Sequence, residues 1–333
     1  MKHTMSAVFL ILGVASAAGC NKAGTDADAV RARGLAQMHS GKFDQAIAAF
    51  DSAIQMNPND ADAYNSRGNA HASKRDHDRA IVSFDSAIRL RPNYALAFRN
   101  RGVSHAATDD FDRAMKDFDQ AIALKPDYAS AFNSRGFARQ LTGDYEHALQ
   151  DDDRSIELAP ESPAAYRNRA NVRFILGRFG DAASDLERSV KFIEAATPRS
   201  ERFNETGGYA VVWLHVAKMR QGQDDAAEFA INSARVDSTY WPRPLITFFQ
   251  GKLTADELVA LTASVADPKL RNDQRCGAQF FAGQSALWKK QFGEARTRLT
   301  TMSTTCSKRF IENAAAVADL ARLRSAAKRA HAT

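Results

Sequence analysis

The sequence lacks the short motifs by which many catalytic sites are recognised. It has no Gly-x-Ser-x-Gly nucleophile elbow, no glycine-rich phosphate loop and no His-Glu-x-x-His metal site. Its histidines are scattered, and Cys276 and Cys306 have no histidine near them at a metal-ligand spacing. These absences speak against hydrolase, nucleotide-binding and zinc-dependent chemistry. We therefore expect no catalytic residue, no bound metal and no cofactor.

The apolar stretch at the N-terminus, Ala7–Ala15, is too short to span a bilayer comfortably. Lys2 precedes this stretch, and a run of small residues ends it directly before Cys20. A basic residue, an apolar stretch and small residues in this order are typical of a secretory signal. We therefore expect residues 1–19 to be removed and the remaining chain to be exported.

A period of 34 residues governs the first half of the chain. Prolines recur at this step, at Pro58, Pro92, Pro126 and Pro160. Glycines keep the same step, at Gly34, Gly68, Gly102 and Gly136. Between them, apolar residues recur at three- and four-residue steps, which predicts helices and not strands. Two residue types locked to one period of this length indicate a tandem array of helical hairpins.

The repeat begins at Ala27, Ala61, Ala95, Ala129 and Pro163. Small residues at positions 8 and 20, such as Gly68 and Ala80, allow two antiparallel helices to approach closely. Apolar, mainly aromatic residues at positions 4 and 24 fill the space beside that contact. Proline at position 32 ends the second helix, because it lacks an N–H and restricts the residue before it.

This pattern resembles the tetratricopeptide repeat (TPR), with five repeats over residues 27–196. The resemblance implies an all-α solenoid of helix hairpins, wound into a right-handed superhelix with a concave groove. It also implies that the groove binds extended or helical protein segments, through positions 2, 5, 6, 9 and 12 of each first helix. The residues expected to form this peptide-binding groove are Asn65, Asn69, Arg99, Asn100, Asn133, Phe137, Arg167, Asn168, Asn171 and Phe174.

One TPR subclass holds a terminal carboxylate in a clamp of lysine, asparagine and arginine. Asn65, Asn69 and Asn100 match that clamp, but the basic positions of the next repeat are Ser130 and Ser134. We therefore do not predict capture of a C-terminal carboxylate.

Two further positions carry charged or titratable residues in several repeats. Position 7 is arginine in four repeats: Arg67, Arg101, Arg135 and Arg169. Such a ladder either clamps carboxylates of a ligand or pairs with second-helix acids such as Asp85 and Asp119. His71 and His105 share position 11, where we expect packed, partly buried imidazoles and not a ligand site.

The fourth repeat has Asp152 at position 24, where three repeats have phenylalanine and one has leucine. Burying an unpaired carboxylate is costly. We therefore expect a cation such as Arg135 or Arg169 beside Asp152, or a rotated helix that exposes it.

The end of the signal, Ala-Ala-Gly-Cys, resembles the lipobox of bacterial lipoproteins. That resemblance implies a lipoprotein signal peptide in residues 1–19, acylation of Cys20 and a tether in residues 20–26. Asn21 after the cysteine favours the outer membrane by the same analogy. An ordinary cleaved signal, with Cys20 incidental, is the alternative.

The pattern breaks at residues 197–207, which read as a linker rich in turn-forming residues. Residues 208–330 are then expected to form a C-terminal, TPR-like α-helical region. Helices are expected at 211–220, 226–234, 279–289, 292–300 and 310–324, with a rigid Trp-Pro-Arg-Pro corner at 241–244 and a capping box at Thr254 and Glu257. This arrangement resembles the periplasmic TPR lipoproteins of the new lipoprotein I type.

With Cys20 assigned to lipid, Cys276 and Cys306 remain as a pair in an exported chain. Cys276 opens the first helix of a predicted hairpin and Cys306 follows the second, so the two residues come together. We expect a disulfide; two free buried thiols are the alternative.

Charge is spread along the chain, with 45 basic and 39 acidic side chains. An envelope location argues against nucleic acid as the reason for the basic excess. The C-terminal tail is the exception, since Arg322, Arg324, Lys328 and Arg329 follow the last acid, Asp319. Either a solvated helix end or contact with an anionic membrane or cell-wall surface explains this tail.

The sequence thus predicts a non-catalytic scaffold, anchored by lipid in the bacterial envelope and facing the periplasm. The resemblance implies cell-wall hydrolases or a protease as partners docked by the adaptor. A pilotin-like assembly factor for an outer-membrane secretin or β-barrel is the alternative within the binding class. An enzyme with a diffuse site in the second half is the alternative outside that class.

Overall fold

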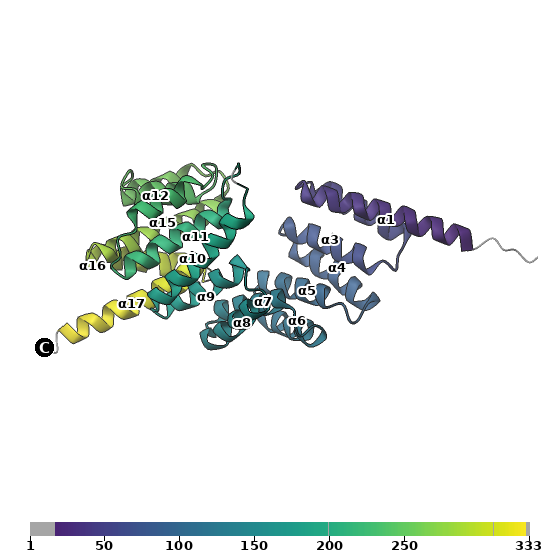
Figure 1. The fold of residues 1–333 in the computed structure, drawn as a ribbon, viewed down its shortest axis with the longest axis horizontal. Coiled ribbons are helices and arrows are strands. Elements are labelled where there is room, and N and C mark those ends of the chain that lie inside the picture. Colours follow the sequence, from purple (N-terminus) through teal and green to yellow (C-terminus); the bar gives the residue numbers. More distant parts are fainter. Residues whose placement is uncertain (1–16, 199, 309, 331–333) are drawn as a thin grey trace, which may run out of the picture. The chain divides into compact units, whose positions relative to one another are not determined.

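The computed structural model describes residues 17–198, 200–308 and 310–330, and all the regular structure within them is helical (Figure 1). The only β interaction among these residues is one isolated bridge between Phe203 and Val236. The predicted all-α fold is therefore confirmed. Most of the predicted signal, residues 1–16, lies outside the described residues. None of the described helices is long and apolar enough to cross a membrane.

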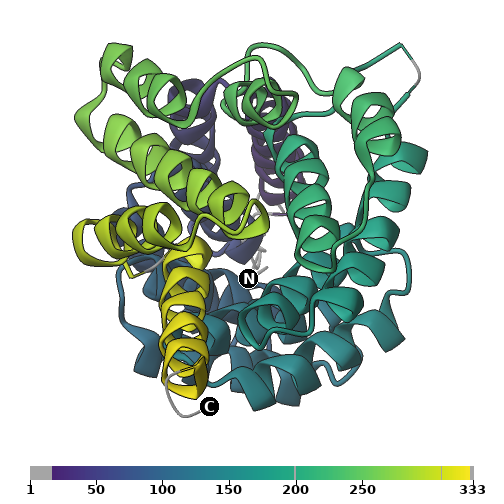
Figure 2. The same ribbon diagram turned by 90° about the vertical axis from the view of Figure 1, so that its left-hand side faces the viewer.

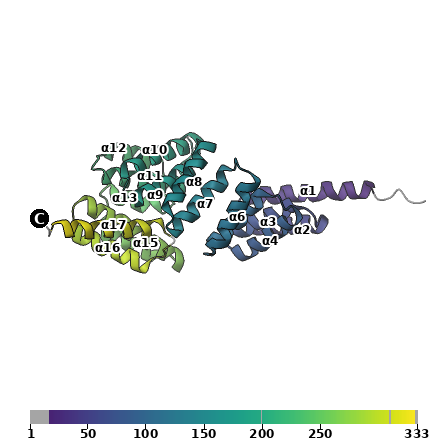
Figure 3. The same cartoon turned by 90° about the horizontal axis from the view of Figure 1, so that it is seen from below.

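The chain forms two compact units, residues 1–126 and 127–333. The helices of unit 1 are α1 (Ala17–His39), α2 (Phe43–Met56), α3 (Ala61–Ser73), α4 (His77–Leu90), α5 (Ala95–Ala107) and α6 (Phe111–Leu124). They pair as three antiparallel hairpins, which Figure 3 shows side by side. Helix α1 runs through residues 20–26, so the predicted tether is helical in this structure.

Within each hairpin the two helices touch where the repeat has glycine. A Cβ atom added to Gly68 would lie 2.5 Å from the Phe84 ring, and one added to Gly102 would lie 2.7 Å from Phe118. Both phenylalanines are fully buried. The glycine is required because an aromatic ring of the second helix occupies the space of its side chain.

The turn inside each hairpin depends on one residue with positive φ at repeat position 15. The φ value is 69° at Gly41, 63° at Arg75 and 65° at Asp109 in unit 1, and it is 84° at Gly143 and 79° at Gly177 in unit 2. Positive φ favours glycine, so the backbone is strained at Arg75 and Asp109, where the same turn is formed without glycine. Asp60, Asp76 and Asp110 cap the helices that follow them.

Unit 2 continues the repeats and adds the C-terminal helices. Its helices are α7 (Ala129–Thr142), α8 (Tyr145–Leu158), α9 (Pro163–Ile175), α10 (Phe179–Ala196), α11 (Glu205–Arg220), α12 (Ala226–Ala234), α13 (Pro242–Phe249), α14 (Ala255–Leu261), the 3₁₀ turn η1 (Thr262–Ser264), α15 (Pro268–Trp288), α16 (Phe292–Thr305) and α17 (Ile311–Ala330). In Figure 2, α17 is the yellow helix beside the yellow-green helices α15 and α16.

Several predicted boundaries in the second half change. Helix α11 begins at Glu205, inside the predicted linker, and α15 begins at Pro268, well before the predicted residue 279. The Trp-Pro-Arg-Pro segment is not a corner but the first turn of α13, where proline is tolerated because the first N–H groups of a helix have no internal partner. The capping box of Thr254 and Glu257 is confirmed.

The core of unit 2 is aromatic and centres on Trp213 of α11. The ring centroid of Trp213 lies 5.0 Å from that of Phe174, 5.3 Å from Phe280 and 5.6 Å from Phe281. These rings come from α9 and α15, which are far apart in sequence. The C-terminal helices therefore share one core with the last repeat.

Candidate functional site

The residues predicted to form a peptide groove lie in both units, and each unit is described separately. In unit 1, Asn100 Nδ2 donates to Asn65 Oδ1 over 3.1 Å, and both side chains are buried. Arg99 Nη1 donates to Asn100 Oδ1 over 3.2 Å. Asn69 is half-buried one turn along α3 from Asn65. Asn65 and Asn100 are therefore occupied by each other and hold α3 against α5.

The same pairing recurs in unit 2, where Asn168 Nδ2 donates to Asn133 Oδ1 over 3.0 Å. Both pairs join position 5 of one repeat to position 6 of the next. The sequence carries a signal of this pairing that the groove prediction did not use: Asn-Ser-Arg begins at 65 and 133, whereas Arg-Asn-Arg begins at 99 and 167. These asparagines fix the register between first helices, so an approaching ligand would meet them already paired.

Phe174, another predicted groove residue, lies in the core and not in an open groove. Its side chain is 1% exposed and packs edge-on against Phe179 and Trp213, with ring centroids 4.9 and 5.0 Å away. The prediction for this residue is wrong because α11 packs against the last repeat and covers the position. Asn171, one turn earlier on α9, is buried as well.

Arg167 of α9 is the groove residue that stands apart from the rest. Its side chain is half-buried, and no hydrogen bond or acidic partner for it occurs within the described residues. Burial lowers the pKa of this guanidinium, because desolvation disfavours its charged form. The positive charge of Arg167 is therefore partly removed from water without a negative charge to compensate it among the described residues.

Phe137 belongs to α7, which packs against α9, the helix of Arg167. The hydrogen bond between Asn133 and Asn168 aligns α7 with α9 at these two residues. Phe137 lies one turn further along α7 from Asn133. Its ring is 41% exposed, unlike the buried phenylalanines of the repeats. Gln140, further along α7, is buried, and within the described part of the chain neither its side-chain oxygen nor its nitrogen has a hydrogen-bond partner. This face of α7 and α9, which we call the α7–α9 face, offers a cation, an aromatic ring and amide groups.

The arginines at position 7, in contrast, form ion pairs with aspartates of the same chain. Arg101 donates to Asp117 over 2.9 and 2.6 Å and to Asp85 of the preceding repeat over 2.7 Å. Arg169 donates to Asp185 over 2.9 and 2.6 Å and to Asp153 over 2.6 Å. Of the two alternatives for this ladder, intramolecular pairing is the one present. The arginines join consecutive repeats and are not available to a ligand.

The prediction for Asp152, a bonded cation or an exposed position, is wrong. Its side chain is fully buried, and neither carboxyl oxygen has a hydrogen-bond partner among the residues that the structure describes. Arg135 bonds Asp151 instead, and Arg169 bonds Asp185 and Asp153. The helix has not rotated, because Ala148 and Ser155 occupy the same buried face of α8. Burial therefore raises the pKa of Asp152 well above its ordinary value.

The two histidines at position 11 belong to the packing of unit 1. His71 Nδ1 lies 3.6 Å from Asp76, and His105 Nε2 lies 3.9 Å from Asp117. Burial lowers the pKa of both rings. Within the described part of the chain, no three His, Cys, Asp or Glu side chains are placed to hold a metal ion.

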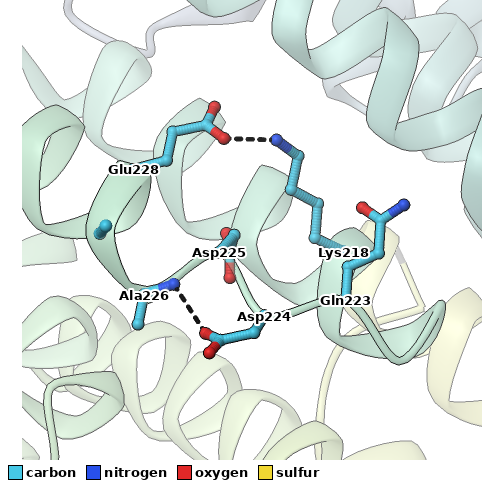
Figure 4. Close-up of a pocket in the computed structure, with 7 residues that line it drawn as sticks. Lys218, Gln223, Asp224, Asp225, Ala226 and Glu228 are labelled. Carbon is cyan, nitrogen blue, oxygen red and sulfur yellow. Dashed lines mark hydrogen bonds and ion pairs between the residues drawn. The ribbon is translucent and has the colours of Figure 1, made fainter.

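A polar pocket lies at the turn between α11 and α12 (Figure 4). Lys218 reaches across it to Glu228, with Nζ to Oε2 at 2.6 Å, and it also bonds Glu187 at 2.8 Å. Asp224 accepts from the backbone N–H of Ala226. The lysine and both glutamates therefore satisfy one another's charges.

Cys276 and Cys306 are joined by a disulfide, with the Cα atoms 5.9 Å apart. The bond ties the body of α15 to the C-terminal end of α16. Cys20 lies in α1, and its acylation stays a prediction.

Comparison with known proteins supports the architecture. Residues 31–95, 74–129 and 99–163 match the family model of the tetratricopeptide repeat. The solved structure of PilW, a widely conserved type IV pilus biogenesis factor, is similar with a TM-score of 0.53 at 20% identity; the match covers 62% of this chain and 90% of PilW. PilF of Pseudomonas aeruginosa is similar with a TM-score of 0.53 at 17% identity, covering 71% of this chain and 100% of PilF.

No curated protein matches the chain. At identities of this level, the likeness to the solved structures shows the fold alone. Together with the family match and the repeat geometry described above, it shows that residues 31–163 are tetratricopeptide repeats and that the chain folds as an all-α tetratricopeptide-repeat solenoid.

Proposed function

We propose that this chain is a non-catalytic adaptor that binds a segment of another protein on the α7–α9 face of unit 2. The observation that carries the proposal is Arg167, a half-buried cation without an acidic partner in the described residues. Burying a cation without compensation costs free energy, and a carboxylate from a ligand would recover it. The exposed ring of Phe137 on the neighbouring helix α7 offers an apolar contact to the same ligand.

The ligand that fits is an acidic protein segment with an apolar side chain close to a carboxylate. A helix or an extended strand laid along α7 and α9 would present both groups. The carboxylate belongs to a side chain in this proposal, because the clamp for a terminal carboxylate is absent. Cell-wall hydrolases or an envelope protease are the proposed partners, in a periplasmic location with Cys20 as the lipid anchor.

Site-specific photo-crosslinking in live cells tests the adaptor role. A crosslinker at Phe137 should capture a defined partner, whereas one at Ile231, which is 70% exposed on α12, should not. Arg167→Gln should weaken the captured complex about tenfold or more, because it removes a desolvated charge. Arg154→Gln on the outer helix α8 is the matched control. Equal capture from both crosslinker positions would contradict the proposal.

Purification of the captured complex from detergent extract separates the proposed partners. Hydrolases or proteases support docking of cell-wall enzymes, whereas a secretin or β-barrel protein supports the assembly-factor alternative. Sustained peptidoglycan hydrolysis by the purified chain would overturn the adaptor role altogether.

Metabolic labelling with palmitate tests the anchor separately. Incorporation into the wild-type chain that disappears in Cys20→Ser is the expected result. Labelling that persists in Cys20→Ser would remove Cys20 as the acylation site without affecting the proposed groove.

A further inference from the structure

The turn between α15 and α16 exposes two large aromatic side chains. Trp288 is 50% exposed and Phe292 is 53% exposed, whereas Phe280 and Phe281 of the same hairpin are fully buried. Lys289 and Lys290 lie between them, and both are exposed. The turn has the same backbone conformation as the turns of the repeats. Lys290 has a positive φ of 59°, and the equivalent residue of each repeat also has a positive φ.

The last turns of α17 lie at the same end of unit 2. Asn313 Nδ2 donates to the backbone oxygen of Cys306 over 3.1 Å, so α17 begins where α16 ends and runs back along it. Gln284 Nε2 donates to Asp319 Oδ2 over 2.8 Å, which sets α17 level with α15. One turn beyond these residues are Trp288 on α15 and Leu323 on α17. Figure 1 shows α16 and the free end of α17 at the same end of unit 2.

This end carries a positive charge that acidic neighbours do not cancel. After Asp319 the chain has no acidic residue, and Arg324 and Lys328 on the last turns of α17 are exposed. Asp319 itself is buried and bonds Arg220 and Arg322. Glu294, the acid nearest to the turn in α16, pairs with Arg298 at 2.9 Å.

The turn has a rigid support. The disulfide between Cys276 and Cys306 closes the far end of the α15–α16 hairpin. One turn before Trp288, Arg220 of α11 donates to Gln284 of α15 and to Asp319 of α17, each over 2.8 Å. The exposed aromatic residues are therefore held in place by a cross-linked scaffold and do not fold back into the core.

We propose that Trp288, Lys289, Lys290, Phe292, Arg324 and Lys328 form a tip surface that docks on an anionic phospholipid bilayer. Tryptophan and phenylalanine partition into the headgroup region of a membrane, and lysine and arginine beside them are attracted by anionic lipids. Two exposed aromatic residues on one turn, with two lysines between them and two further cations on the last turns of α17, match that interface in both apolar and charged parts. These residues are separate from the α7–α9 face, so bilayer docking stands or falls independently of the adaptor role.

Fluorescence of Trp288 tests the proposal in the full chain. The emission of Trp288→Phe is subtracted from that of the wild type, which removes the contribution of Trp213 and Trp241. Vesicles of phosphatidylglycerol and phosphatidylethanolamine should shift the Trp288 emission to the blue, and lipids brominated on their acyl chains should quench it. Vesicles of phosphatidylcholine alone should do neither. An unchanged Trp288 spectrum with anionic vesicles would overturn the proposal.

Substitutions at the tip separate charge from apolar contact, again with Trp288 as the reporter. Lys289→Gln with Lys290→Gln should raise the half-saturating concentration of anionic lipid about 25-fold, since each cation contributes about fivefold. Phe292→Ala should raise it about tenfold. The matched controls are Lys252→Gln with Lys269→Gln, and Ile231→Ala, all exposed and outside the tip surface.

Equal effects of the tip and control substitutions would contradict a localised docking surface. A spectral shift with poly-glutamate but none with vesicles would assign the tip surface to an acidic protein and also overturn the bilayer proposal. Because every substituted side chain is exposed, circular dichroism is expected to show unchanged helicity for each variant, so loss of docking is distinguished from loss of folding.

Discussion

Arg101 holds the carboxylate of Asp117 with two of its nitrogens, at 2.9 and 2.6 Å, and reaches Asp85 of the preceding repeat with a third. Asp117 is buried, whereas Asp85 is exposed. The arginine therefore closes its own hairpin and joins that hairpin to its neighbour. A position that could have clamped a ligand instead stabilises the stack.

Replacing Arg101 by methionine should lower the free energy of unfolding by about 3 kcal/mol, because Asp117 would remain buried without a partner. The repeats supply a matched control. Arg67 occupies the same position but meets Ser83 and the half-exposed Asp51, so no buried carboxylate is left when it is replaced. Arg67→Met should cost less than about 1 kcal/mol. Urea unfolding followed by circular dichroism measures both, and equal losses would contradict the role of Asp117.

Asp152 should make the stability of the chain fall as the pH rises. Its pKa is raised on folding, so above the ordinary aspartate pKa the folded state binds more protons than the unfolded state. The contribution to stability is thus fully present at acidic pH and is lost as the pH rises toward the folded-state pKa, by up to about 1.4 kcal/mol per pH unit. Asp152→Leu should remove this slope and should be more stable than the wild type at neutral pH.

The measurement for Asp152 is urea unfolding of both proteins at several pH values. Taking the difference between them cancels the groups that both proteins share. Parallel curves for wild type and Asp152→Leu would show that the carboxyl is not protonated in the folded protein.

Glu312 should produce a second pH dependence, confined to a known window. Its side chain is buried at the start of α17, and burial raises its pKa from 4.5 to about 7. The sign is the same as for Asp152: the contribution of Glu312 to stability is present below pH 4.5 and is lost between about 4.5 and 7. Glu312→Gln should reduce the slope of the stability profile in that window and leave the part due to Asp152, whereas the exposed Glu201→Gln should leave the slope unchanged. A flat wild-type profile would contradict the shifted pKa.

The sequence was sufficient for the fold because the repeat encodes contacts between neighbouring hairpins. The ring of Phe84 requires glycine sixteen residues earlier, at Gly68, and the same pair recurs as Gly102 and Phe118, so one spacing predicts many contacts. The lone capping box at Thr254 was equally predictable, since its two bonds join residues three apart. Local chemistry of this kind needs no knowledge of distant segments.

The site was harder to predict, because its state depends on contacts outside the repeat. Phe174 has a groove position by number, but α11 covers it with Trp213. Asn65 and Asn100 suit hydrogen bonding to a peptide, yet they bond each other across two repeats. Asp152 was expected to attract a cation, but each nearby arginine already had a better-placed aspartate. The packing of the whole unit therefore decides which charged side chains are left without an ion-pair partner among the described residues, as Arg167 is.

Removing the disulfide should destabilise unit 2 by about 3–4 kcal/mol, the chain-entropy value for a loop of 30 residues. Cys276→Ala with Cys306→Ala should lower the urea midpoint for the unfolding of unit 2. Hydrogen exchange of α3 to α6 in unit 1 is the internal control, because that unit contains no disulfide among its described residues. A loss of protection spread equally over both units would contradict a local effect of the bond.

Gly68 and Phe84 should show strong energetic coupling. Gly68→Ala places a Cβ 2.5 Å from the Phe84 ring, and such overpacking costs about 1–3 kcal/mol. The fifth repeat shows the tolerated exchange, because Ala170 replaces the glycine there and Leu186 replaces the aromatic ring. Phe84→Leu should therefore restore part of the stability lost in Gly68→Ala. In a double-mutant cycle the coupling free energy should favour the pair by about 1 kcal/mol or more.

The control for this cycle is Gly293→Ala in α16, where an added Cβ meets no atom within 4 Å. That substitution should raise stability by about 0.5–1 kcal/mol, because alanine loses less conformational entropy than glycine in a helix. If Gly68→Ala were as benign as Gly293→Ala, the glycine of the repeat would be needed for something other than room for the ring. Additive effects in the cycle would lead to the same conclusion, since a steric clash must disappear when the ring that causes it is removed.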